Sequence, residues 1–145
     1  MCRRQALLSA PVESVWELVG NPGLHPRWWP RVLEVDGRRF EAGDRYVQVT
    51  RTPAGRSRTT FAIERLEDLH EVRMRCLDTG MYSHWRLTAA QGGTFVDVEF
   101  GMEAQKLGDR LFDRVAGRAY YRRWTQQSLE ALAEAARLDA LADRA

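Results

Sequence analysis

The chain has 145 residues, of which 44% are hydrophobic and 29% are charged. A chain of this length folds around one core that buries roughly 70% of the surface of the unfolded chain, so we expect a single domain over 1–145. The 22 Lys and Arg against 20 Asp and Glu leave a net charge of +2, and the arginines are spread along the whole chain. Nucleic acid is therefore not expected as a partner, because phosphate binding needs a concentrated basic stripe.

The sequence contains no metal-binding motif and no membrane-spanning run. The two cysteines, Cys2 and Cys76, and the three histidines lack the spacing of zinc motifs, so we expect neither a metal nor a cofactor. The apolar run near the start is cut short by Pro11 and Glu13, and no other run approaches the length of a membrane span. These patterns predict a reduced, cytoplasmic protein.

The first thirty residues predict a strand followed by two short helical segments. Residues 3–9 are typical of a strand. From Pro11 to residue 19, apolar side chains recur every three or four residues, which predicts an amphipathic helix that ends at the Gly- and Pro-containing segment 20–23. Segment 24–30 places two tryptophans between two prolines and predicts a helical turn followed by a loop.

The middle of the chain predicts an antiparallel sheet, and the end predicts a helix. Short runs with β-branched or aromatic residues at alternate positions are separated by turn residues, so we expect strands joined by hairpin turns. The expected strands are 31–36, 44–52, 57–66, 71–77, 81–89 and 94–103. Residues 106–142 contain no proline and are rich in Ala, Leu, Arg and Glu, which predicts one long helix.

Alternation along the last three strands predicts one apolar and one charged face of the sheet. The apolar face is expected to hold Val72, Met74, Cys76, Trp85, Leu87, Val96, Val98, Phe100 and Met102. On the charged face we expect Asp97 and Glu99 near Arg86, so that opposite charges meet across neighbouring strands. The C-terminal helix is the element long enough to cover the apolar face.

Several short motifs follow one another in an order known from one protein family. Segment 8–16 (LSAPVESVW) resembles the I-x-A-P-x-x-x-V-W opening of the polyketide cyclase/dehydrase and lipid transport family, within the START/Bet v 1-like (SRPBCC) superfamily. Further similar segments are 28–30 (WWP), 43–44 (GD), 85–87 (WRL), 93–96 (GTFV) and 129–132 (LEAL). The resemblance spans nearly the whole chain.

The resemblance implies an α+β helix-grip (Bet v 1-like) fold. In this fold a curved seven-stranded antiparallel sheet wraps around a long C-terminal helix, and two short helices lie between strands 1 and 2. An apolar cavity lies between sheet and helix, where members bind lipids, sterols or polyketides, and some cyclise polyketide chains. The family shares no universal catalytic motif, so the resemblance implies a pocket for a hydrophobic small molecule rather than a reaction. We expect a monomer or a homodimer.

The cavity would be walled by large apolar side chains. The expected wall residues are Trp28, Trp29, Phe61, Met74, Trp85, Val98, Phe100, Met102 and Val115. Trp28 and Trp29 admit two interpretations, a gate at the cavity mouth or a packing anchor that closes the end of the sheet. The others are most simply core residues, although in a cavity protein the core and the ligand wall are one surface.

Polar side chains interrupt the apolar stripe in the middle of the long helix. In a straight helix Arg118, Arg122 and Gln126 face the cavity, where an arginine could bind a ligand carboxylate, phosphate or carbonyl. Alternatively, the helix shifts its phase near Gly117 and the arginines face water. The side chains that would then face inward are Tyr120, Tyr121 and Trp124.

Tyrosine and histidine side chains are the remaining candidates for acid–base chemistry. Tyr46 alternates with Gln48 and Thr50, and if this set faces the cavity, Tyr46 could donate a proton, with Tyr120 as a second donor. Otherwise the set is one face of an outer strand. His84 is expected on the outer face, exposed and solvated, because its neighbour Trp85 points inward.

Three functions are compatible with these patterns. The first is a binding or carrier protein for a hydrophobic small molecule. The second is a polyketide aromatase/cyclase or dehydratase, in which Arg118 or Arg122 stabilises an enolate. The third is a regulatory or protein-interaction domain, such as a toxin–antitoxin component, whose cavity is filled by side chains. The space under the last helix distinguishes among them.

Overall fold

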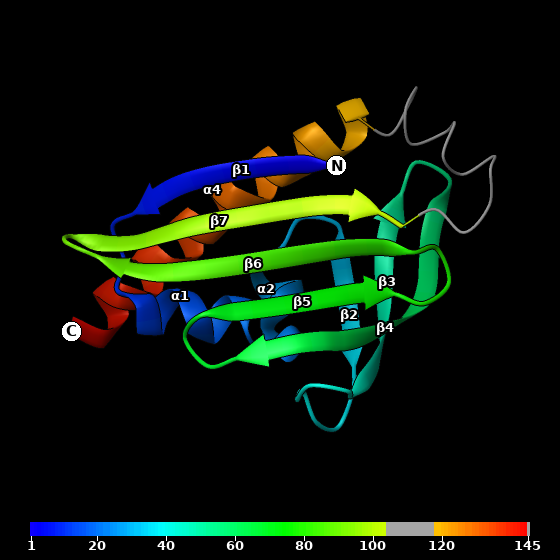
Figure 1. Cartoon of the computed structure of the whole chain (residues 1–145), viewed down its shortest axis with the longest axis horizontal. Coiled ribbons are helices and arrows are strands. Elements are labelled where there is room, and N and C mark those ends of the chain that lie inside the picture. The colour runs from blue at the N-terminus through cyan, green and yellow to red at the C-terminus, as the bar shows by residue number, and fades with distance from the viewer. Residues whose placement is uncertain (104–117, 145) are drawn as a thin grey trace.

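The computed structural model describes residues 1–103 and 118–144. One antiparallel sheet, with strand order β1-β7-β6-β5-β4-β3-β2, curves around the long helix α4 (Arg118–Arg144) (Figure 1). The strands are β1 (Cys2–Leu8), β2 (Val32–Asp36), β3 (Arg45–Thr52), β4 (Gly55–Glu67), β5 (Glu71–Cys76), β6 (Met81–Ala90) and β7 (Gly93–Met102). Between β1 and β2 lie α1 (Val12–Val19), η1 (Pro22–Leu24) and α2 (His25–Trp28). The predicted α+β helix-grip fold is confirmed.

The curvature of the sheet creates the space that the helix occupies. In Figure 1, β2 and β3 run across the direction of β5, β6 and β7. Two register shifts accompany this change of direction, one between Val32 and Glu34 of β2 and one between Ile63 and Arg65 of β4. Such irregularities bend a strand and increase its twist. The sheet therefore presents a concave face toward α4.

The short helices begin and end where local sequence signals place them. Helix α1 begins at Val12, directly after Pro11, and ends at Val19, before Gly20, within one residue of the predicted bounds. The side chain of Asn21 accepts a hydrogen bond of 3.1 Å from the backbone N–H of Gly23 and thereby caps η1. Pro22 occupies the first position of η1, where its missing N–H costs nothing. These signals turn the chain sharply and direct α2 under the sheet.

The predicted strand faces are confirmed. The expected apolar set is buried, apart from Met102, which is half-buried. On the outer face Asp97 lies opposite Arg86, as expected, but its ion pair is with Arg3 at 2.5 Å. Strand β4 begins at Gly55 rather than at residue 57. The predicted helix 106–142 is confirmed from residue 118 onward, and its first part lies outside the described residues.

Candidate functional site

A cluster of aromatic rings fills the centre of the concave face. The ring of Trp29 stacks on Trp28 and Trp124, with centroids 5.4 and 5.8 Å apart. The rings of Trp85 and Phe100 lie against the same indole at 5.5 and 5.6 Å. Each aromatic pair adds about 0.5–1.5 kcal/mol beyond its buried area, so this cluster is a strong packing centre.

The cluster is anchored by hydrogen bonds as well as by packing. Trp29 donates its indole N–H to Ser128 Oγ at 2.8 Å, and Trp28 donates to the carbonyl of Leu18 at 3.0 Å. Both side chains are buried. These contacts favour the interpretation of Trp28 and Trp29 as packing anchors, since a gate would have to leave these hydrogen-bond partners unpaired when it opens.

A cavity of about 90 Å³ remains beside the aromatic cluster. It lies between the first turns of α4, the strands β3 and β4, and the turn that joins β5 to β6. Its wall is formed by Thr50, Thr52, Ser57, Thr59, Phe61, Cys76, Thr79, Met81, Tyr120 and Trp124. Aromatic and sulfur-containing side chains thus cover one part of the wall, and hydroxyl groups cover another.

The hydroxyl groups of the cavity wall differ in how far the protein satisfies them. Thr50 Oγ1 accepts a hydrogen bond of 2.9 Å from the side-chain amide of Gln48, and Thr52 Oγ1 donates to a backbone carbonyl. Ser57 and Thr59, both on β4, make no side-chain hydrogen bond within the described part of the chain. These two hydroxyls are available to a bound molecule.

The two predicted proton donors occupy different surroundings. Tyr46 faces the interior but is buried, with its ring stacked on Phe61 at 5.6 Å. Burial, and to a lesser extent the charge of Cys76, raises the pKa of the Tyr46 phenol well above its usual value, which disfavours loss of its proton. Tyr120 lines the cavity and carries the guanidinium of Arg31 over its ring at 4.7 Å.

Of the two orientations considered for the arginines of α4, Arg122 adopts the one that faces away from the core. Both Arg122 and Gln126 are exposed, whereas Tyr121 and Trp124 are buried on the opposite face of the helix. In the described part of α4 the aromatic side chains are therefore the ones that face the interior, because they gain free energy on burial whereas burying an unpaired guanidinium costs free energy. The proposed phase shift near Gly117 lies outside the described residues. Arg122 is not among the residues that line the cavity beside the aromatic cluster. The side chain of Arg118 lies outside the described residues.

Only part of the predicted cavity wall lines the observed cavity. Phe61 and Tyr120 belong to the wall. The residues that pack in the core or beside the wall are Trp28, Trp29, Met74, Trp85, Val98, Phe100 and Met102. Val115 lies outside the described residues. The hydroxyl wall was missed, although the alternation of polar residues on two paired strands, 46–52 and 55–61, is the signal that could have revealed it.

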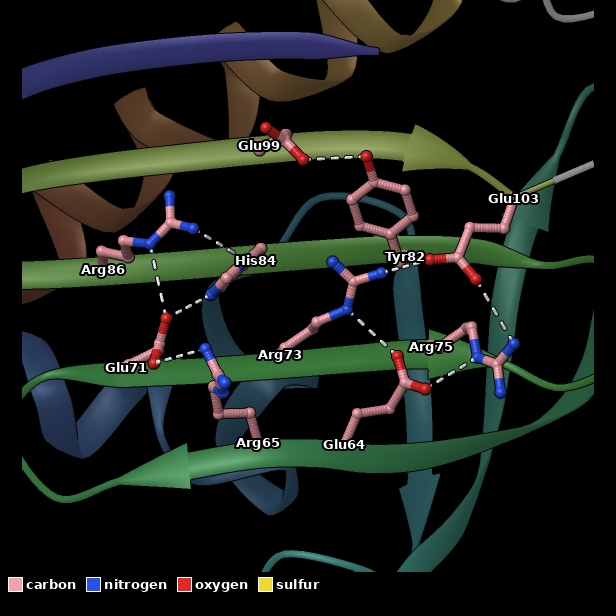
Figure 2. A network of polar contacts seen from close by, with 10 residues as sticks. All are labelled: Glu64, Arg65, Glu71, Arg73, Arg75, Tyr82, His84, Arg86, Glu99 and Glu103. Carbon is pink, nitrogen blue, oxygen red and sulfur yellow. Dashed lines mark hydrogen bonds and ion pairs between the residues drawn. The ribbon is translucent and has the colours of Figure 1, made fainter.

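The outer face of the sheet carries a second polar cluster, shown in Figure 2. His84 lies on this face, as predicted, but it is covered rather than solvated, with 5% of its surface exposed. Its Nε2 lies 2.6 Å from Glu71 Oε2, and Arg65 and Arg86 approach the same carboxylate at 3.6 and 3.4 Å. The expectation of an exposed His84 failed because long charged side chains on adjacent strands close over the imidazole.

The protonation states of this pair follow from its surroundings. Burial is the largest influence on His84 and, with the nearby arginines, lowers its pKa despite the hydrogen bond to Glu71. Burial alone would raise the pKa of Glu71, but the hydrogen bond from His84 and the charges of Arg65 and Arg86 outweigh it and lower that pKa. A neutral imidazole therefore donates to an ionised carboxylate.

A ring of four charges extends this cluster toward the end of β7 (Figure 2). Glu64 and Glu103 each contact both Arg73 and Arg75, at distances between 2.5 and 3.4 Å. Every charge in the ring therefore contacts two charges of the opposite sign. The ring therefore links β4 and β5 to Glu103, the residue that follows β7.

The described ranges contain no cluster of metal-binding side chains and no membrane-spanning helix. Within 1–103 and 118–144, no group of three or more His, Cys, Asp or Glu side chains could hold a metal ion. Among the helices of these ranges, none is long and apolar enough to cross a membrane.

Comparisons with solved structures agree with the fold. A protein from Nitrosomonas europaea superposes with a TM-score of 0.75 at 16% identity, covering 95% of this chain and 94% of the other. A Thermus thermophilus protein gives 0.74 at 18% identity, with 95% and 97% covered. An AHSA1-like protein from Aeromonas hydrophila gives 0.68 at 17% identity, with 97% and 94% covered. At these identities the likeness concerns the fold alone. No curated protein matches the chain significantly.

Family membership follows from the sequence match and the fold together. Residues 3–137 match the family described as polyketide cyclase / dehydrase and lipid transport, the family that the short motifs resemble. The match covers nearly the whole chain, and the helix-grip architecture is the one that the resemblance implies. This chain is a member of the polyketide cyclase/dehydrase and lipid transport family.

Proposed function

We propose that this protein binds a small, mostly apolar molecule with one polar group in the cavity beneath the start of α4. The observation that carries the proposal is the composition of the cavity wall. Phe61, Met81 and Trp124 supply apolar surface, whereas Ser57 and Thr59 supply hydroxyls that have no side-chain hydrogen bond to any described residue. Sites of this kind use apolar walls for affinity and a few polar groups for orientation.

The size of the cavity limits the ligand. Its volume of about 90 Å³ is well below the ~300 Å³ or more of pockets that enclose drug-sized molecules. The aromatic cluster around Trp29 occupies the central space where a larger ligand would lie. We therefore propose a short-chain amphiphile, or one end of a longer molecule, in place of a whole lipid.

The filled centre favours one second candidate function, a regulatory or protein-interaction domain. In that case the aromatic cluster stabilises the fold, and the cavity is a packing defect that holds water instead of a ligand. Ligand binding and protein interaction make opposite predictions for small amphiphiles, so one experiment separates them.

The experiment measures binding of matched short-chain alcohols, ketones and alkanes by tryptophan fluorescence and native mass spectrometry. We expect alcohols and ketones to bind more tightly than alkanes of the same length. Thr59→Val removes one hydroxyl at constant shape, and it should weaken alcohol binding about 3- to 10-fold, the value of one hydrogen bond, without changing alkane binding.

The matched control is Thr60→Val, which alters the next residue of the same strand on the opposite face of the sheet. It should leave binding unchanged. If no amphiphile binds at millimolar concentration, or if the two variants bind identically, the cavity is not a ligand site.

A further inference from the structure

One edge of the sheet is open. Among the described residues, strand β1 is the last strand on its side and pairs only with β7. In the described part of the chain, no backbone group of β1 bonds to anything on its free side. Figure 1 shows β1 along the rim of the sheet, with α4 passing behind it. A free edge of this kind presents a row of unpaired N–H and C=O groups that can pair with another extended chain.

Arginines from two elements converge beside this edge. Arg4 of β1 and Arg122 and Arg123 of α4 line one open hollow of about 530 Å³ between strand and helix. All three side chains are exposed. None of them forms an ion pair within the described residues, in contrast to Arg3, which is bound by Asp97.

The acidic side chain in the same hollow does not neutralise this cluster. Glu130 also lines the hollow, but it accepts a hydrogen bond of 3.0 Å from Gln126 and forms no ion pair with the three arginines. Arg4 and Arg122 also line a neighbouring hollow of about 420 Å³. Like charges held together without counter-charges repel one another, and a bound carboxylate relieves that repulsion through paired hydrogen bonds with guanidinium groups.

We infer that the free edge of β1 binds an extended acidic segment of another polypeptide, which adds to the sheet as an eighth strand. The backbone of β1 would hold the segment, and Arg4, Arg122 and Arg123 would select its charge. This recognition mode takes affinity from main-chain hydrogen bonds and specificity from alternate side chains.

The side chains on the two faces of β1 indicate which residues the partner segment should carry. Arg4 lies opposite Val98, on the face of the sheet that meets α4. Leu7 lies opposite Phe95 on the outer face, and both are exposed, by 63% and 38%. Because side chains of a strand alternate between faces, the partner should carry acidic residues at every second position and apolar residues between them.

The test uses the whole protein and synthetic peptides of seven residues, the length of β1. The probe is a fluorescent Glu-Val-Glu-Val-Glu-Val-Glu peptide, followed by anisotropy. The control peptide has the same composition with its four glutamates in one block. We expect the alternating peptide to bind at least about tenfold more tightly, a difference of ~1.4 kcal/mol. Hydrogen exchange should show newly protected amides in β1 only with the alternating peptide.

Matched protein variants test the arginines. Arg122→Glu/Arg123→Glu reverses two charges at the hollow, whereas Arg38→Glu/Arg39→Glu makes the same change at two exposed residues of the loop between β2 and β3. The first variant should weaken peptide binding about tenfold or more, and the second less than about twofold. Because all four positions are exposed, melting temperatures should stay close to that of the parent protein.

Other outcomes overturn the inference. Equal binding of both peptides, or binding without protection of β1 amides, would mean that charge alone attracts the peptide. If the alternating peptide does not bind, but phosphatidylglycerol vesicles or single-stranded DNA bind in a manner that requires Arg122 and Arg123, the patch serves a membrane or a nucleic acid instead. If none of these probes binds, the arginines merely protect the edge.

Discussion

His25 is expected to make the stability of this protein fall as the pH falls. Its side chain is fully buried, and its ring packs edge-on against Trp28 and Trp29 with centroids 5.7 and 4.9 Å apart. Nε2 lies 2.9 Å from the carbonyl oxygen of Val19, which assigns the proton of the neutral ring to Nε2. Nδ1 is buried and has no hydrogen-bond partner within the described residues. Protonation would therefore place an unpaired charge among indole rings.

The magnitude follows from the pKa of this group. Burial, opposed only in part by the hydrogen bond to Val19, lowers the pKa of His25 from 6.5 to about 4. Between these two pH values the unfolded chain binds a proton and the folded protein does not. The free energy of unfolding therefore decreases as the pH falls, by up to ~1.4 kcal/mol per pH unit and about 3 kcal/mol in total. It is recovered as the pH rises above 6.5.

The assay is urea denaturation at several pH values from 7 to 4, with NMR titration of the histidine ring protons of the folded protein. His25→Gln keeps a donor for Val19 and should remove most of the slope. His84 contributes with the same sign, because its pKa is also lowered, so the slope should shrink without vanishing. The control is His70→Gln, which alters an exposed histidine. A titration of His25 at pH 6.5 or above, or an unchanged slope in His25→Gln, would refute the reasoning.

Three further predictions concern packing and charge. Trp29→Ala should lower the free energy of unfolding by about 3–5 kcal/mol, and added indole should restore part of this loss by filling the new cavity. The control is Trp16→Ala, which removes a half-buried tryptophan. Equal losses in the two variants would contradict the packing role of Trp29. Gly80→Ala should lower the free energy of unfolding by about 1–3 kcal/mol more than Gly92→Ala. Both glycines have φ near +80°, but only at Gly80 would an added Cβ meet a carbonyl oxygen, that of Glu103, at 2.2 Å. Equal melting temperatures of the two variants would disprove this contact. Asp97→Asn should lower the free energy of unfolding by about 1 kcal/mol or less, because its ion-pair partner Arg3 is half exposed. This loss of stability should be smaller in 1 M salt, which screens the ion pair. A loss that salt does not change would mean that the ion pair is not the cause.

The sequence alone determined the elements and the faces of the strands. Side chains of a strand alternate in direction whatever lies nearby, so Met74, Trp85 and Val98 could be assigned to the interior from local spacing. The turns could be located for a similar reason, because Gly and Pro restrict the backbone over a few residues. The ordered motifs likewise identified the family before the fold was known.

Tertiary structure decided the placement of the side chains whose neighbours are distant in the chain. Arg122 faces water because Tyr121 and Trp124 compete more strongly for the buried side of α4, and that competition depends on what the sheet offers. The central space is full because Trp28 and Trp29 reach Trp85, which lies on a strand far along the sequence. Local sequence patterns carry no information about contacts between residues far apart in the chain. The small cavity and the arginine-lined edge of β1 could therefore be found only in the folded structure.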